Sequence, residues 1–219
     1  MSKLSLIIYN IHSLFFCLRY LPFKQAIKIP ILIHPSVKVR IDKSSSIVFP
    51  GRIWRSMLSY GFRAAEGRSN FHSMLVLRNG SQLFIKGAVI MSKGTRTIVD
   101  GGKMEIGHHF FCNGDCSFYC DTNIRIGDDN MYGWYVHFNT TDGHSFFVNG
   151  KQRPMNASIT IGNHVWIGAN SIISKGTMVA SECVVAQCSL VNGRHDEEHC
   201  LVGGIPARLI KKNVFWSAK

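Results

Sequence analysis

Residues 161–191 read IGNHVWIGANSIISKGTMVASECVVAQCSLV, and this stretch decides the fold. An aliphatic residue returns at every sixth position, at Ile161, Ile167, Ile173, Val179, Val185 and Val191. A period of six matches neither an amphipathic helix nor a simple alternating strand. It matches a short strand and a turn repeated around a three-sided coil, in which three hexads complete one rung and the aliphatic residues stack into a continuous core.

The same phase is present earlier in the chain, first loosely and then strictly, at Ile106, Cys112, Phe118, Ile126, Tyr132 and Phe138. Between about residues 31 and 98, apolar and polar residues alternate, as in Val37–Ile41, which is typical of strands in irregular early coils. The sequence therefore predicts an all-β protein. A parallel β-helix solenoid covers residues 31–203, a short N-terminal helical segment residues 1–30, and a C-terminal basic tail residues 204–219.

The second position of each hexad is small, at Gly162, Gly168, Ser174, Ala180, Ala186 and Asn192. We expect small residues there because the backbone turns tightly. The hexads stop after Val191. The polar cluster 194–200 that follows is interpreted as a hydrophilic loop in preference to a metal site.

The formal charge of +12 arises from 25 Lys and Arg residues against 13 acidic residues, and it predicts affinity for an anionic partner. No basic run typical of nucleic-acid-binding arms is present, so nucleic acid is not expected. Seven cysteines and no evident signal peptide indicate free thiols in the cytoplasm. Cys112, Cys116 and Cys120 are four residues apart, but this spacing gathers ligands only in a helix, so no metal is expected.

The N-terminal stretch from Leu4 to Leu21 is apolar but is interrupted by Asn10, His12, Ser13 and Arg19. It falls short of the roughly 20 apolar residues that a spanning helix needs. We expect a helix that caps the end of the core. The alternative is peripheral membrane association through residues 4–21, with the cytoplasmic protein at the inner face of the membrane.

The hexad pattern breaks at a histidine. Counting on by sixes from Phe138 places the next inward position at His144, and the step of seventeen residues from there to Ile161 is not a multiple of six. Residues 143–158, which include Gly150 and Pro154, are therefore predicted to protrude as a loop. Histidine suits proton transfer near neutral pH. From the residue alone, a histidine that only forms hydrogen bonds within its loop is an equally good interpretation.

Three motifs in order carry a resemblance to a known family: Asp142-Gly143-His144, residues 161–170, and residues 204–208, which read GIPAR. Together they resemble the hexapeptide-repeat acetyltransferases, and within these the maltose, galactoside and polysaccharide O-acetyltransferase branch. The resemblance covers about residues 83–212. It implies a left-handed coil, a homotrimer with active sites between subunits, and direct transfer of an acetyl group from acetyl-CoA to a sugar hydroxyl without a metal.

The resemblance also implies roles for particular residues. His144 matches the general base, and a backbone N–H near Gly168 or Ala169 would stabilise the oxyanion. Direct transfer forms no acyl-enzyme, so no cysteine has to act as nucleophile. The positions that match acceptor-binding residues are Asn113, Asp121 and Asp142. The positions that match the acetyl-CoA groove and its phosphate contacts are Trp166, Gly168, Ala169, Ala186, Gln187, Arg208 and Lys211.

Some of these roles have alternatives. Asn113 and Asp121 could equally be turn formers at coil corners, and Trp166 could pack at a subunit interface. The stretch 186–188, which reads Ala-Gln-Cys, departs from the Gly-Ala-Gly turn frequent in the family and leaves the contact near Gln187 open.

Two other functions stay open on the sequence. A zinc enzyme of the carbonic anhydrase type would draw on His108, His109, His137, His144 and His164, but the pair with four intervening residues that such sites show is absent. A β-helix without turnover would act as a scaffold or binding module. The long early segment and an N-terminus that could contact a membrane favour a cell-surface polysaccharide or its precursor, lipid-linked or not, as the acceptor.

Overall fold

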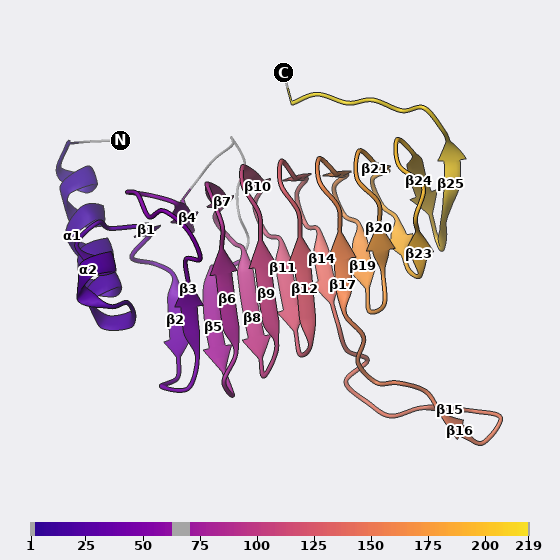
Figure 1. Ribbon diagram of the computed structural model, residues 1–219, viewed down its shortest axis with the longest axis horizontal. Helices are drawn as coiled ribbons and strands as arrows, with labels where there is room; N and C mark the ends of the chain where they lie inside the picture. Colours follow the sequence, from indigo (N-terminus) through magenta and orange to yellow (C-terminus); the bar gives the residue numbers. More distant parts are fainter. Residues whose placement is uncertain (1–2, 63–70, 219) are drawn as a thin grey trace.

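A computed structural model describes residues 3–62 and 71–218 as a three-sided coil of parallel strands (Figure 1). The chain visits three sheets in turn, and within each sheet the strands of successive coils pair in parallel. In the regular part, Ile161 pairs with Val179 and Ile167 with Val185, eighteen residues on in each case. The predicted all-β solenoid of hexads is confirmed. Residues 63–70 of the early coils lie outside the described residues.

Each sheet forms one side of the solenoid. Sheet A contains β1 (Ile31–Ile33), β4 (Leu58–Tyr60), β7 (Val89–Met91), β10 (Phe110–Cys112), β13 (Met131–Tyr132), β18 (Trp166–Ile167), β21 (Val184–Val185), β24 (Leu201–Gly204) and β25 (Ala207–Lys211). Sheet B contains β2 (Lys38–Ile41), β5 (Met74–Arg78), β8 (Arg96–Asp100), β11 (Ser117–Cys120), β14 (His137–Asn139), β19 (Ile172–Ser174) and β22 (Leu190–Val191). Sheet C contains β3 (Ser46–Val48), β6 (Gln82–Ile85), β9 (Lys103–Ile106), β12 (Asn123–Ile126), β17 (Ile159–Ile161), β20 (Met178–Val179) and β23 (Arg194–His195). The edges where the sheets meet are called the A–B, B–C and C–A corners.

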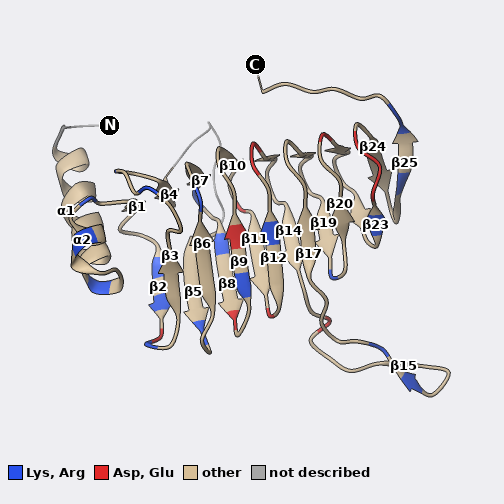
Figure 2. Cartoon of the chain, viewed as in Figure 1, with Lys and Arg blue, Asp and Glu red and all other residues tan. Residues whose placement is uncertain are grey.

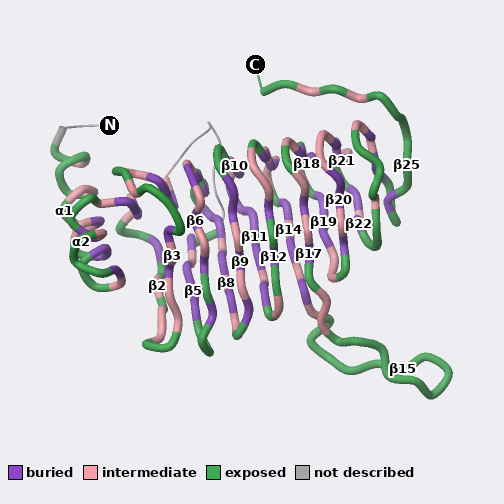
Figure 3. The backbone as a smooth tube through the Cα atoms, viewed as in Figure 1, coloured by how far each residue is buried: buried purple, intermediate pink, exposed green. Residues whose placement is uncertain are grey.

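The interior of the coil is buried along most of its length, and in the early strand β2 Val39 and Ile41 are only partly buried (Figure 3). The hexad residues from Ile126 to Val191 are all buried, and each buried aliphatic or aromatic side chain stabilises the fold by roughly 1.5–3 kcal/mol. Tyr132 packs on Phe110 and Phe138 with ring centroids 5.0 and 5.4 Å away. The repeat therefore builds one continuous core although no single rung could bury its own side chains.

A tight backbone turn was expected to explain the small second residue of each hexad. At Gly168 the structure shows another reason, which is the close stacking of neighbouring coils. A Cβ on Gly168 would lie 2.5 Å from the backbone nitrogen of Gln187 in the next coil, so the coils stack too closely at this corner for a side chain on Gly168. The tight turn falls at a later position instead. Asn170, with φ of 59°, is one of several corner residues other than glycine that adopt the left-handed conformation.

A long loop leaves the solenoid at the B–C corner between β14 and β17 (Figure 1). The strand β17 returns to the coil so that Ile161 pairs with Ile126. The predicted protruding loop at 143–158 is therefore confirmed. The inward position predicted for His144 is wrong, because Ile161 fills the core position next to Ile126 and His144 is exposed in the loop.

The solenoid continues beyond the last hexad. Residues 194–195 form β23, which pairs with β20 through Arg194 and His195, so the stretch predicted as a hydrophilic loop instead begins with another strand of the coil. After β24, the turn at Ile205–Pro206 sends β25 back antiparallel to it. Residues 212–218 then run back along the outside of the solenoid (Figure 1).

The N-terminal segment forms α1 (Lys3–Tyr20) and α2 (Phe23–Ala26) at the start of the solenoid. One side of α1 packs on β1, where Phe16 and Cys17 are buried and the N–H of Ile33 donates to Oγ of Ser13 at 3.0 Å. Among the described residues, no helix is long and apolar enough to cross a membrane.

Candidate active site

An elongated cleft of about 610 Å³ lies on the outer face of sheet A beside the A–B corner. Six of the residues that the sequence assigned to cofactor or acceptor binding line it together: Asn113, Trp166, Gly168, Ala169, Ala186 and Gln187. They come from the coils of β10, β18 and β21, and the coil of β13 lies between the first two. Such a row of small residues beside an exposed indole can admit a narrow, flexible molecule along the solenoid.

The backbone N–H groups of Gly168 and Ala169 lie in the wall of the cleft. The N–H of Gly168 already donates to the carbonyl of Val185 at 2.8 Å. The N–H of Ala169 makes no hydrogen bond within the part of the chain that the structure describes. Of the two candidate oxyanion donors, Ala169 is therefore the one that can receive a new partner.

Asn113 lines the same cleft and has a buried acceptor atom. Its backbone N–H donates to the carbonyl of Tyr132 at 3.0 Å, which fixes the residue at the A–B corner. Its Oδ1 atom is buried and has no hydrogen-bond partner among the described residues. A buried amide oxygen without a partner costs about 1–3 kcal/mol, which a bound hydroxyl or N–H group would offset.

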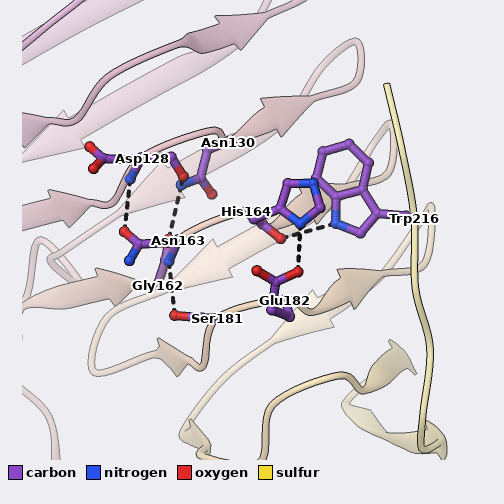
Figure 4. A network of polar contacts seen from close by, with 8 residues as sticks. All are labelled: Asp128, Asn130, Gly162, Asn163, His164, Ser181, Glu182 and Trp216. Carbon is purple, nitrogen blue, oxygen red and sulfur yellow. Dashed lines mark hydrogen bonds and ion pairs between the residues drawn. The ribbon is translucent and has the colours of Figure 1, made fainter. Parts of the chain in front are cut away.

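The C-terminal segment forms the other side of the cleft. Trp216, Ser217 and Ala218 line it opposite the A–B corner. The indole of Trp216 stacks on the ring of His164 with centroids 4.2 Å apart and an interplanar angle of 12°, and its Nε1–H donates to the His164 carbonyl at 3.0 Å (Figure 4). Trp216 also lies 6.2 Å from Trp166, centroid to centroid. Two indoles therefore flank the cleft.

A ladder of polar contacts across the C–A corner fixes His164 (Figure 4). The backbone N–H of Asp128 donates to Oδ1 of Asn163 at 2.9 Å, and the N–H of Asn163 donates to Oγ of Ser181 at 3.1 Å. Nδ1 of His164 lies 2.6 Å from Oε2 of Glu182. These contacts join three coils, so the surface on which Trp216 rests is held rigidly.

The loop that carries His144 is anchored to the B–C corner by a lysine. Nζ of Lys175 lies 2.5 Å from Oδ2 of Asp142, contacts the carbonyl of Pro154, and sits 5.6 Å from the centre of the Phe146 ring. Beyond this anchor the loop forms a small hairpin of β15 (Phe147–Val148) and β16 (Lys151–Gln152). His144 is thus exposed on a tethered loop.

Asp121 lies at the base of the same loop. Its backbone N–H donates to Oγ1 of Thr140 at 2.8 Å. Partial burial and the nearby carboxylate of Asp100 raise the pKa of Asp121, against the lowering effect of Arg78. The carboxyl group is therefore held near the B–C corner and away from the cleft lining.

The structure separates the predicted residues into three places. Asn113 and the residues that match the acetyl-CoA groove gather at the cleft on sheet A, whereas Asp121, Asp142 and His144 gather at the B–C corner. Arg208 and Lys211 lie exposed on β25, at the end of sheet A beyond the cleft. Within one chain, His144 does not line the cleft.

Several lining residues were missed by sequence reasoning. Trp134 and Met131 belong to coils whose hexads were recognised, so their place next to Trp166 and Gly168 could have been inferred from the register. Trp216 lies outside every repeat. No periodic pattern in the sequence connects it to His164. The only signal that could have indicated it is the presence of a tryptophan in a basic tail.

The cysteines have a structural role and not a catalytic one. Six of the seven are buried, and Cys188 is the exposed one. Burial raises the pKa of Cys120 to about 12, and burial also raises the pKa of Cys116. Protonated thiols in the core are poor nucleophiles and poor metal ligands. The described residues hold no group of three or more His, Cys, Asp or Glu side chains arranged to bind a metal ion.

The chain is similar in sequence and in structure to several known proteins. It is 33% identical over 198 residues to an uncharacterized 24.8 kDa protein in the cps region of Klebsiella pneumoniae, covering 90% of this chain and 86% of that protein. It is 34% identical over 135 residues to the polysialic acid O-acetyltransferase of Escherichia coli O1:K1 / APEC, covering 61% of this chain and 42% of the relative. The crystal structure of the polySia-specific acetyltransferase NeuO has a TM-score of 0.58 and 23% identity, covering 85% of this chain and 91% of the other. No protein-family model matches the sequence.

Fold, cleft and relatives together define an acyltransferase built on a left-handed parallel β-helix. The chain belongs to the hexapeptide-repeat acetyltransferases, in the branch of the maltose, galactoside and polysaccharide O-acetyltransferases. The family resemblance and the left-handed coil expected from the three motifs are confirmed.

Proposed function

We propose that the protein is an acetyl-CoA-dependent O-acetyltransferase acting on a sugar hydroxyl of a cell-surface polysaccharide or its precursor, in the cytoplasm. The observation that carries the proposal is the cleft on sheet A, where six residues assigned to cofactor or acceptor binding meet. The names of the relatives supply the substrate class, because the Escherichia coli O1:K1 / APEC relative is a polysialic acid O-acetyltransferase.

The donor would lie along the cleft with its pantetheine arm beside Gly168, Ala169, Ala186 and Gln187. The indoles of Trp166 and Trp216 would flank it as apolar walls. Its phosphates would continue toward β25, where the exposed Arg208 and Lys211 supply cationic donors.

The reaction would be a direct transfer with His144 as the general base. The imidazole takes the proton from the acceptor hydroxyl as the hydroxyl oxygen attacks the thioester carbonyl carbon. The N–H of Ala169 donates to the resulting oxyanion. When the tetrahedral intermediate collapses, the carbon–sulfur bond breaks and the departing CoA thiolate takes the proton back from His144.

The acceptor would be held by Asn113 and Asp121, which supply an amide and a carboxyl group for sugar hydroxyls. The unpartnered Oδ1 of Asn113 supports its part in this role. Asp142 was also expected to bind the acceptor. Because its carboxylate already pairs with Lys175, we assign it instead to holding the loop of His144 in place.

The placement of these groups favours a site shared between subunits of a homotrimer. His144 belongs to the loop at the B–C corner, whereas the cleft lies beside the A–B corner. Three parallel solenoids that place the loop corner of one chain against the cleft of the next would bring the base to the thioester. One such site would form at each of the three interfaces.

The test measures free CoA thiol released from acetyl-CoA with a panel of sugars, nucleotide sugars and polysaccharides. The account expects acceptor-dependent release, a loss of about 10²–10⁴ in kcat for His144→Ala, and an unchanged dissociation constant for CoA. The exposed His72→Ala serves as the matched control and should keep full activity.

Two outcomes would overturn the proposal. Absence of release with every acceptor, together with no CoA binding, would favour a scaffold or binding module. Activity that survives His144→Ala but is lost with a zinc chelator would favour the zinc enzyme.

A further inference from the structure

The N-terminal helix α1 carries an apolar stripe on the side that faces away from the solenoid. The large apolar side chains of α1 that point away from the solenoid follow helical spacing and are 42–67% exposed: Leu4, Ile7, Ile8, Ile11, Phe15 and Leu18. A cap that only covered the core would turn its apolar stripe inward and expose polar residues. Figure 3 shows this outer side of α1 exposed.

The inner side of the helix packs tightly on the first coil from Ser13 onward, so the outward stripe there is not an effect of loose packing. Phe16 and Cys17 are buried against the first coil, and Ser13 is buried with its Oγ accepting from the N–H of Ile33. Nη2 of Arg55, between β3 and β4, donates to Oδ1 of Asn10 at 2.6 Å and also ties the helix to the first coil. The orientation of α1 is therefore fixed by contacts on its inner side.

The stripe continues beyond α1 and is accompanied only by positive charge. Phe23 and Ile27 are 69% and 55% exposed at and just after α2. Arg19, Lys24 and Lys28 are exposed in the same segment (Figure 2). The sequence contains no Asp or Glu before Asp42. An apolar stripe flanked by cations is the pattern of a helix that lies in the interface of an anionic membrane.

We propose that α1 and α2 form a docking surface for an anionic lipid bilayer. The helix would lie in the plane of the interface with its outer side chains among the upper acyl chains and its cations at the headgroups. A second copy of the same surface is a poorer occupant, because it would bring clusters of like charge together without an acidic partner in residues 1–41. The inference does not depend on the acetyl-transfer reaction.

The experiment is flotation of the full chain with vesicles of phosphatidylcholine alone and of phosphatidylcholine with 30% phosphatidylglycerol. The wild-type protein should float with the anionic vesicles. The double variant Ile8→Gln, Phe15→Gln should bind them at least about tenfold more weakly, since two large side chains leave the apolar phase. The matched control is Phe147→Gln, Val148→Gln, which makes the same kind of change at exposed positions of the β15–β16 hairpin and should bind as wild type.

A second variant separates charge from burial. Lys24→Gln, Lys28→Gln should weaken binding to anionic vesicles and reduce its dependence on salt. Circular dichroism melting of every variant shows whether the fold is kept, and these exposed substitutions should leave it intact. No flotation of folded wild-type protein, or equal flotation of the α1 variant and its control, would overturn the proposal. A smaller oligomer in the α1 variant without any vesicle binding by wild type would assign the stripe to a second copy instead.

Discussion

Trp216 stacks face to face on His164, which lies 52 residues earlier in the chain, and donates its indole N–H to the same residue's carbonyl oxygen. This pair fastens the C-terminal segment to the C–A corner and makes the segment one wall of the cleft on sheet A. Residues 216–218 therefore take part in shaping the site that the hexads build.

Replacement of Trp216 tests this wall. Trp216→Ala should weaken CoA binding roughly tenfold, because the stacking contact and the wall are both lost, whereas Trp216→Phe should keep most of the affinity. Isothermal titration with CoA measures the effect. The exposed Trp54→Ala, in the early part of the chain, is the matched control and should bind CoA as wild type. Tighter binding by Trp216→Ala would mean that the segment obstructs the cleft.

Thiol reactivity tests the protonated, buried state of the cysteines. In the native protein a thiol reagent should label Cys188 quickly and the six buried cysteines only on unfolding. High pKa values such as that of Cys120, about 12, slow the reaction further because the thiolate is the reactive form. Cys188→Ser should abolish the fast labelling and keep acetyl transfer. Loss of transfer in that variant would contradict a direct mechanism without an acyl-enzyme.

The unfolding free energy should depend on a carboxylate on sheet C. Oxygens of Glu105 lie 2.8 Å from Nζ of Lys86 and 2.7 Å from Nζ of Lys103, and these two bonds lower the pKa of Glu105 to about 2. A lowered pKa in the folded state stabilises the protein above the ordinary carboxyl pKa, and this contribution disappears as the pH falls toward 2.

The comparison is between wild type and Glu105→Gln in urea unfolding at stepped pH. Their difference in unfolding free energy should be below about 1 kcal/mol near neutrality, because the pair is partly exposed, and it should shrink between about pH 4.5 and 2. The exposed Glu198→Gln serves as the matched control for the loss of one carboxylate. A constant difference for Glu105→Gln across this range would show that the two lysines do not stabilise the carboxylate.

The repeat could be read from the sequence because its physical cause is local. Each hexad residue from Ile126 to Val191 faces the core from the next side of the coil, and every third one stacks one rung further on. The spacing alone therefore predicts three strands per coil and the residues that meet at the cleft. The loop was predicted for the same reason, since the step to Ile161 breaks the period. The position of His144 was misread because an insertion suspends the count, and Ile161 takes the core position next to Ile126.

The features that could not be predicted from the sequence depend on contacts between distant segments. The stacking of Trp216 on His164 joins residues that no periodicity relates. The direction of α1 could not be read either, because both sides of the helix carry apolar residues, with Phe16 facing the first coil and Phe15 facing outward. Only the packing on β1 decides which side is exposed.

The central claim is that the base of one subunit serves the cleft of another, and mixed oligomers test it most directly. Two variants are inactive alone in this account: His144→Ala lacks the base, and Gln187→Trp fills the cleft from an exposed lining position. Refolded or co-expressed together in equal amounts, they should regain about a quarter of wild-type activity, because one interface in four joins an intact loop to an intact cleft. Mixed oligomers that stay as inactive as their parents would contradict the account.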